Sequence, residues 1–182
     1  VKYIKSMINC EKKFYDVGPF TVNPNSGTAT VSIVSNNAQG NDVRNRSGNS
    51  ILCKALYARM LLSGNTGVIT NLRMLVVKDI EGTGSIPGIT DILQSNSILS
   101  PLNVDTTPRW QVLRDKTFTL SSGVSFQKQV KLYIKINDHL KYTGPLQSDI
   151  YKNQLYVCFV CDQPLATQPS CSITSRMSFY DN

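Results

Sequence analysis

Charged residues and histidine are scarce in this chain of 182 residues. Asp, Glu, Lys and Arg together make up 17% of the sequence, less than the quarter that is usual for a soluble globular domain. We infer that copies of the chain cover part of one another's surface. The single histidine, His139, is expected in an exposed turn, and one histidine excludes enzymes that bind a metal through several.

Signatures of catalysis are also lacking. The twelve carboxylates are scattered and form no recognisable glycosidase pair. Neither GxGxxG nor GxxxxGK[ST], the glycine motifs that hold phosphates, occurs. An enzyme on a β-sandwich therefore remains only an alternative, without a coherent acid/base set. We predict no enzymatic activity, no catalytic residue and no required cofactor.

Long apolar runs and disulfide spacing are absent as well. No run approaches the roughly 18 residues of a membrane-spanning helix, so we predict a soluble chain without a membrane partner. Five cysteines are an odd number without framework spacing, which predicts free thiols in a reducing compartment. Cys158 and Cys161 have CxxC spacing, but residues three apart in a strand point to opposite faces, so we interpret them as core residues.

What the sequence does contain is a series of short β-branched and apolar runs between turn residues. Alternation is clearest at 171–180 and at 130–136, where one parity is apolar and the other polar. We predict one all-β domain over 1–182, an eight-stranded antiparallel jelly-roll β-sandwich with one short helix at 89–94 in a long loop. The predicted strands are 12–17, 28–35, 50–63, 68–79, 109–120, 126–137, 154–162 and 171–180.

Three runs depart from simple alternation. Residues 51–62 and 72–77 are apolar on both parities, which predicts strands covered on two faces, by sheet packing or by a neighbouring subunit. In 109–120, a regular strand would place Arg114 and Lys116 on the same face as Trp110 and Phe118. We therefore expect a bulge or bend near residues 113–116.

The formal charge is +7, and an anionic partner such as nucleic acid is plausible on that ground. Cations lead the chain at 1–13, a basic N-terminal segment, and others lie on the predicted strands. A simple solvated basic face is the alternative interpretation, and the sequence does not decide between the two.

Residues 39–49, QGNDVRNRSGN, resemble the QGxDxxxRxG signature of coat proteins of the satellite tobacco necrosis virus type. Related coats occur in circular single-stranded DNA viruses that encode a replication initiator (CRESS-DNA viruses). The resemblance continues, in order, through residues 72–79, 86–93 and 109–115. It therefore extends over most of the chain.

The resemblance implies a viral capsid protein located in the virion. Its partners would be itself, in an icosahedral shell on the order of sixty copies, and a single-stranded DNA or RNA genome bound without sequence preference. It also implies an Arg/Lys-rich arm upstream of Val1. The predicted nucleic-acid-binding residues are Lys2, Lys5, Lys12, Lys13, Lys78 and Arg114, although Lys78 and Arg114 could instead form ion pairs with Asp79 or Asp115.

Some coats of this type bind calcium between subunits, and the matching positions here are Ser47, Ser50 and Asp181. Calcium prefers six to eight oxygen ligands, so waters or a neighbouring chain would have to complete the shell. The alternative is that Asp181 is a polar chain end and 47–50 a turn. For the function as a whole, the alternative is a non-viral jelly-roll binding module, either lectin-like or a cytokine-like oligomer.

Overall fold

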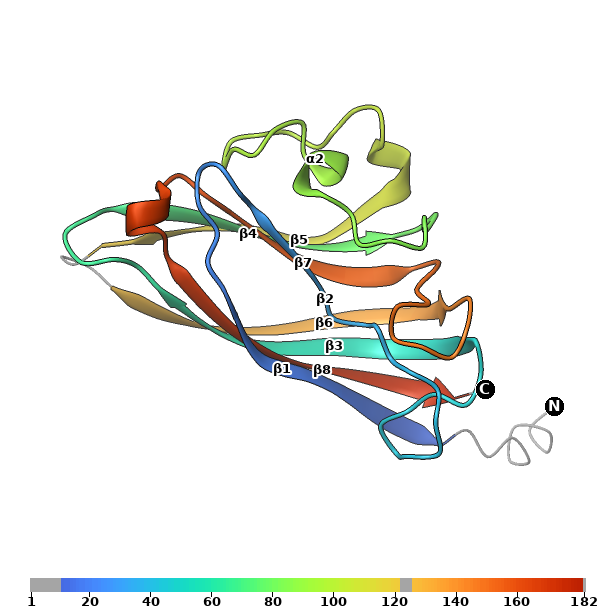
Figure 1. Cartoon of the computed structure of the whole chain (residues 1–182). Helices are drawn as coiled ribbons and strands as arrows, with labels where there is room; N and C mark the ends of the chain where they lie inside the picture. Colours follow the sequence, from blue (N-terminus) through green and yellow to red (C-terminus); the bar gives the residue numbers. More distant parts are fainter. Residues whose placement is uncertain (1–10, 122–125, 182) are drawn as a thin grey trace.

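The computed structural model describes residues 11–121 and 126–181. In this part of the chain, strands alternate with loops and helices are very short (Figure 1). The elements are β1 (Lys12–Val22), β2 (Thr30–Ile33), β3 (Ser50–Ser63), β4 (Thr70–Asp79), α2 (Ile89–Ile92), η1 (Thr107–Arg109), β5 (Trp110–Leu120), β6 (Gln127–Lys141), β7 (Gln154–Cys161), η2 (Leu165–Thr167) and β8 (Ser170–Asp181).

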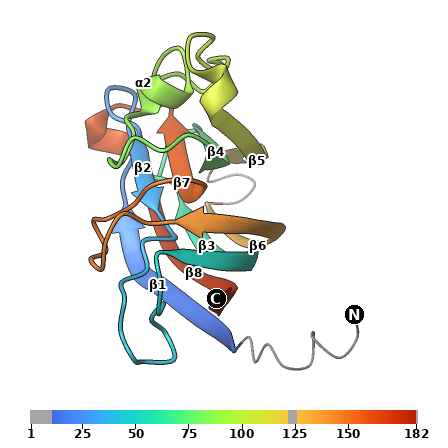
Figure 2. The same cartoon turned by 90° about the vertical axis from the view of Figure 1, so that its right-hand side faces the viewer.

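The strands form two four-stranded antiparallel sheets, in the orders β1-β8-β3-β6 and β2-β7-β4-β5. Consecutive strands therefore mostly lie in different sheets, and the two sheets pack face to face. This is the arrangement of the predicted eight-stranded jelly roll. Figure 2 shows the sheets as separate layers, with β5 and β6 at one side of the molecule and β1 and β2 at the other.

The main hydrophobic core lies between the two sheets. It contains the inward parity of β8, which includes Cys171, Ile173, Met177 and Phe179, all essentially inaccessible. The alternation predicted at 171–180 is confirmed. Burial of this many large apolar side chains is the main favourable term for folding.

A second apolar cluster lies on the outer side of the β2-β7-β4-β5 sheet, beneath α2 and its loops (Figure 1). Leu75 and Val77 of β4 point into it, whereas Met74 and Val76 point into the main core. The prediction that 72–77 is covered on two faces is confirmed, and the cover comes from the same chain. The cysteines of the CxxC segment also diverge, with Cys158 in the second cluster and Cys161 in the main core.

The predicted bulge in β5 is present. Val76 pairs with Arg114 but Val77 pairs with Val112, so Leu113 is the extra residue. Because an extra residue reverses the parity, Trp110 lies in the second cluster while Phe118 lies in the main core.

Several local predictions need correction. His139 lies within β6 and not in a turn, because β6 continues to Lys141. β1 continues to Val22, and the helix ends at Ile92. For β3, the inner face is buried within the chain and Leu61 on the outer face keeps 36% of its surface exposed, so cover of the outer face by a neighbouring subunit stays a prediction.

Candidate nucleic-acid interface

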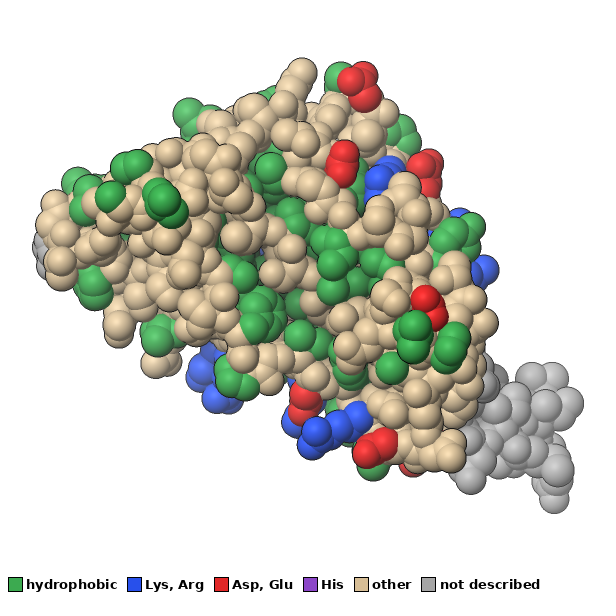
Figure 3. Space-filling view, in the orientation of Figure 1, with side chains coloured by type: hydrophobic (Ala, Val, Ile, Leu, Met, Phe, Trp, Pro, Cys, Tyr) green, Lys and Arg blue, Asp and Glu red, His purple; other side chains and the backbone are tan. Residues whose placement is uncertain are grey.

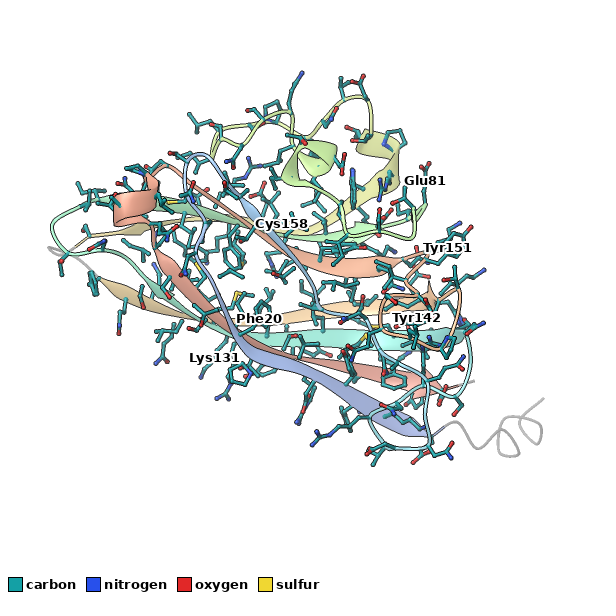
Figure 4. All side chains as sticks on the ribbon, viewed as in Figure 1. Phe20, Glu81, Lys131, Tyr142, Tyr151 and Cys158 are labelled. Atoms are coloured by element: carbon teal, nitrogen blue, oxygen red, sulfur yellow. The ribbon has the colours of Figure 1, made fainter. Side chains whose placement is uncertain are left out.

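The outer face of the β1-β8-β3-β6 sheet is built by strand alternation. In β6, Leu132 and Ile134 are buried in the core, so Lys131, Tyr133 and Lys135 between them point outward. Figure 4 shows Lys131 on this side of the molecule, opposite Glu81. We call this surface the basic face.

All four strands supply cations to the basic face: Lys12, Lys54, Arg59, Lys131, Lys135 and Arg176. Asp16 pairs with Arg176 through two hydrogen bonds of 2.6 and 2.7 Å. The hydrogen bond from Arg176 lowers the pKa of Asp16 below its ordinary value. Between residues 11 and 181, apart from 122–125, the other cations of the face have no ion pair with a carboxylate.

The strand register arranges these side chains in rows. Lys131 lies opposite Arg59, and Tyr133 lies opposite Tyr57 in the next row. Same-face rows on a sheet are roughly 6.8 Å apart along the strands, and facing side chains within a row are in contact range. The basic face therefore carries a row of cations beside a row of aromatic rings.

Three adjoining hollows run along the basic face. The first, of about 290 Å³, is lined by Pro19, Arg59 and Lys131 among others. The second, of about 190 Å³, shares Arg59 with the first, and the third, of about 270 Å³, shares Tyr57 and Arg176 with the second. Neighbouring hollows therefore share lining residues from the cation row to the aromatic row.

Charge differs between the two sides of the molecule. Figure 3 shows Lys and Arg side chains along the lower edge, where the β1-β8-β3-β6 sheet lies, with some acidic side chains beside them. At the other side, exposed carboxylates Glu81 and Asp105 flank α2. The cation Arg109 there is held in an ion pair by Asp79. A polyanion would therefore be attracted to the basic face.

The two predicted strand cations differ in their surroundings. Lys78 is 8% exposed, and its ammonium lies 2.5 Å from Asp138, not from Asp79 as the alternative proposed. Although burial opposes it, the hydrogen bond from Lys78 lowers the pKa of Asp138. Arg114 is exposed on the edge strand β5 and forms no ion pair with Asp115, which is held by Arg73.

The predicted N-terminal cations also differ in where their side chains lie. Lys12 is exposed on the basic face, 5.4 Å from the centre of the Phe14 ring. Lys13 is 7% exposed and points to the opposite side of β1, where it contacts Asp181. Lys2 and Lys5 lie outside the described residues. Of the four, Lys12 is the one that the structure places on the basic face.

The segment 39–49 has a structural role that its resemblance did not specify. Arg46 is fully buried and donates to the backbone oxygens of Asn37, Gly48 and Gly144. Its guanidinium stacks 4.0 Å from the centre of the Tyr142 ring. Arg46 therefore joins two loops and is not available to a genome.

The predicted calcium residues are partly brought together. The backbone N–H and the hydroxyl of Ser47 donate to Asp181 Oδ2 at 2.7 and 2.6 Å, and Lys13 Nζ lies 2.9 Å from the same atom. Burial would raise the pKa of Asp181, but these bonds lower it. Ser50 is separate, with its hydroxyl 3.4 Å from His139 Nδ1.

These residues do not fit a calcium site within one chain. The described residues contain no cluster of three acidic, His or Cys side chains, and calcium needs more oxygen ligands than one carboxylate supplies. The ammonium of Lys13 already provides the positive charge next to Asp181. A site shared between copies of the chain stays a prediction, and Asp181 Oδ1 is buried without a hydrogen bond to the described residues.

Other features agree with the sequence analysis or add to it. Cys53, Cys158, Cys161 and Cys171 are free and buried, and Cys10 lies outside the described residues. None of the helices in the described part of the chain is long and apolar enough to cross a bilayer. Sequence reasoning did not assign Arg59, Lys131 or Lys135 to nucleic-acid binding, although the alternation at 130–136 and the shared parity of Tyr57 and Arg59 in 51–62 were usable signals.

Comparisons with known proteins were made with the sequence and with the structure. The family model for the satellite tobacco necrosis virus coat protein matches residues 1–173. The search of curated protein sequences gave no match.

Three similar solved structures come from viral particles. A chain from Desmodium yellow mottle tymovirus is 10% identical, with 94% of this chain and 88% of that chain covered and a TM-score of 0.44. A chain of the "KBV activated particle at acidic pH" is 8% identical, with 92% and 69% covered and a TM-score of 0.45. A chain of the cyanophage Pam1 capsid is 10% identical, with 96% and 86% covered and a TM-score of 0.35.

Proposed function

Since this chain belongs to the satellite tobacco necrosis virus coat protein family, we propose that it assembles into a small T=1 icosahedral shell, on the order of sixty copies, around a single-stranded genome. The family consists of structural coat proteins, and the place of the chain is the virion capsid. Family membership decides against a non-viral binding module. The genome, DNA or RNA, is held by electrostatic contacts that are independent of sequence.

The observation that carries the packaging proposal is the charge of the basic face. Arg59, Lys131 and Lys135 project from neighbouring strands of one sheet without carboxylate partners among the described residues. Such cations repel one another unless an anion lies against them, and phosphates that replace their counterions gain free energy from counterion release. We therefore assign the basic face to the inside of the shell.

Assembly is supported by apolar side chains that remain exposed in the segments between strands. Leu99 is 87% exposed, Val104 70%, Leu165 69% and Leu146 61%. Large apolar side chains on loops become buried when subunits meet, and this burial contributes to association. The loops at the ends and outer side of the sandwich thus provide the contacts between copies.

A charge-removal experiment tests the packaging proposal. The variant Arg59→Gln/Lys131→Gln/Lys135→Gln is compared with Arg114→Gln/Lys116→Gln/Lys152→Gln, which removes the same charge from β5 of the other sheet and from the loop between β6 and β7. We expect the first variant to assemble with much less nuclease-protected nucleic acid, and to lower the log–log salt slope of binding by about 2, since each phosphate contact on a single strand contributes about 0.7. Equal loss in both variants would show that only net charge matters.

A further inference from the structure

Aromatic side chains on the basic face are more exposed than a sheet surface requires. Tyr133 keeps 66% of its surface exposed and Phe14 39%. Among the described residues, Tyr133 forms no ring pair, whereas Arg59 donates a hydrogen bond to the Tyr57 hydroxyl and its guanidinium lies 5.7 Å from the centre of the Tyr57 ring. A tyrosine ring offers a flat, rigid surface that loses little conformational entropy when another ring stacks on it.

The rings have a defined position among the cations. Tyr133 and Tyr57 face each other across β6 and β3, and both line the third hollow together with Phe14. The row with Lys131 and Arg59 lies on one side of them along β6 and β3, and Lys135 lies on the other. The basic face therefore alternates cation, ring and cation along the direction of the strands.

This alternation matches the alternation of a single nucleic-acid strand. Phosphates need cations, and unpaired bases present planar faces that stack on aromatic rings. A duplex presents phosphates at higher density, but its base faces are hidden in the stack. A surface that works by charge alone therefore holds a duplex at least as tightly as a single strand, because the duplex releases more counterions per contact.

We propose that the basic face selects unpaired nucleic acid, with bases stacked on Tyr133 and Tyr57 and the flanking phosphates held by Arg59, Lys131 and Lys135. This inference rests on the proposed packaging function and deepens it, because it adds a preference for strandedness that charge neutralisation lacks. The ring stacking is independent of base identity, since every base has a π-face.

The test uses the full chain and fluorescein-labelled oligonucleotides of equal length: a single strand with deoxyribose, the same strand with ribose, and a duplex. Binding is followed by fluorescence anisotropy at several salt concentrations. We compare Tyr133→Leu with Tyr133→Phe, which keeps the ring, and with Tyr151→Leu, which removes a 43% exposed ring from the loop between β6 and β7 (Figure 4). The variant Lys131→Gln reports the charge contribution.

We expect Tyr133→Leu to weaken single-strand binding roughly tenfold, which corresponds to about 1.4 kcal/mol, with unchanged duplex binding and an unchanged salt slope. Tyr133→Phe and Tyr151→Leu should bind as the parent chain does. Lys131→Gln should weaken both strand forms and lower the salt slope. Ring dependence with either sugar supports the inference.

Two results would overturn it. If Tyr133→Leu binds the single strand as well as Tyr151→Leu does, or if it weakens binding of the single strand and the duplex equally, unpaired bases do not stack on the rings. In that case, a loss in Lys131→Gln alone would leave packaging by charge intact. If the parent chain binds neither strand form at any salt concentration, the packaging proposal fails together with the inference.

Discussion

Replacing Arg46 tests whether its buried side chain stabilises the fold by joining the loop segment 39–49 to the loop at Gly144. In Arg46→Met the apolar part of the side chain remains, but the guanidinium is lost. Three backbone oxygens then lose a donor, at about 1 kcal/mol each, and the stacking on Tyr142 is worth about 1 kcal/mol. We expect the free energy of unfolding to fall by about 4 kcal/mol.

The matched control is Arg44→Met, because Arg44 lies in the same loop but is exposed, and exposed substitutions change stability by no more than about 0.5 kcal/mol. Unfolding in urea can be followed through the one tryptophan, Trp110. With a slope of about 2 kcal/mol per M, the midpoint of Arg46→Met should fall by about 2 M. Equal midpoints for the two variants would show that the buried Arg46 side chain does not stabilise the fold.

Three further outcomes are expected. Chelation should leave shells intact, whereas Asp181→Asn should destabilise the chain through loss of the ion pair with Lys13; if chelation dissociates shells, copies of the chain share a calcium site. The pKa values of Asp16 and Asp181 are lower in the folded chain than in the unfolded chain. The stability that they contribute is fully present above the unfolded-state pKa of about 3.9 and is lost as the pH falls through the lower folded-state values. An acid titration followed by circular dichroism would contradict this if stability already falls between pH 7 and 5. Burial raises the pKa of Cys53 to about 12, so thiol reagents should modify Cys53 only after unfolding, as peptide mass mapping can check.

Local patterns predicted the fold well, because strand alternation is a local property. The alternation at 130–136 placed Lys131 and Tyr133 on the outer side of β6, as observed. The parity conflict in 109–120 likewise predicted the bulge at Leu113. Such features depend on neighbours in sequence and can be read from one chain.

Contacts between distant residues could not be predicted in this way. The partner of Lys78 is Asp138, sixty residues away, and not the adjacent Asp79. Burial of Arg46 depends on the loop at Gly144. Of the cations on the basic face, only Lys12 was assigned to nucleic-acid binding from the sequence, and the apolar residues of β3 concealed the parity that Tyr57 and Arg59 share.

The central claim is that copies of this chain close into a shell around nucleic acid. Analytical ultracentrifugation of the full chain at micromolar concentration, with absorbance at 260 and 280 nm, tests it most directly. The account predicts one large, uniform species that contains nuclease-protected nucleic acid. A monomer as the only species across all ionic strengths would contradict it.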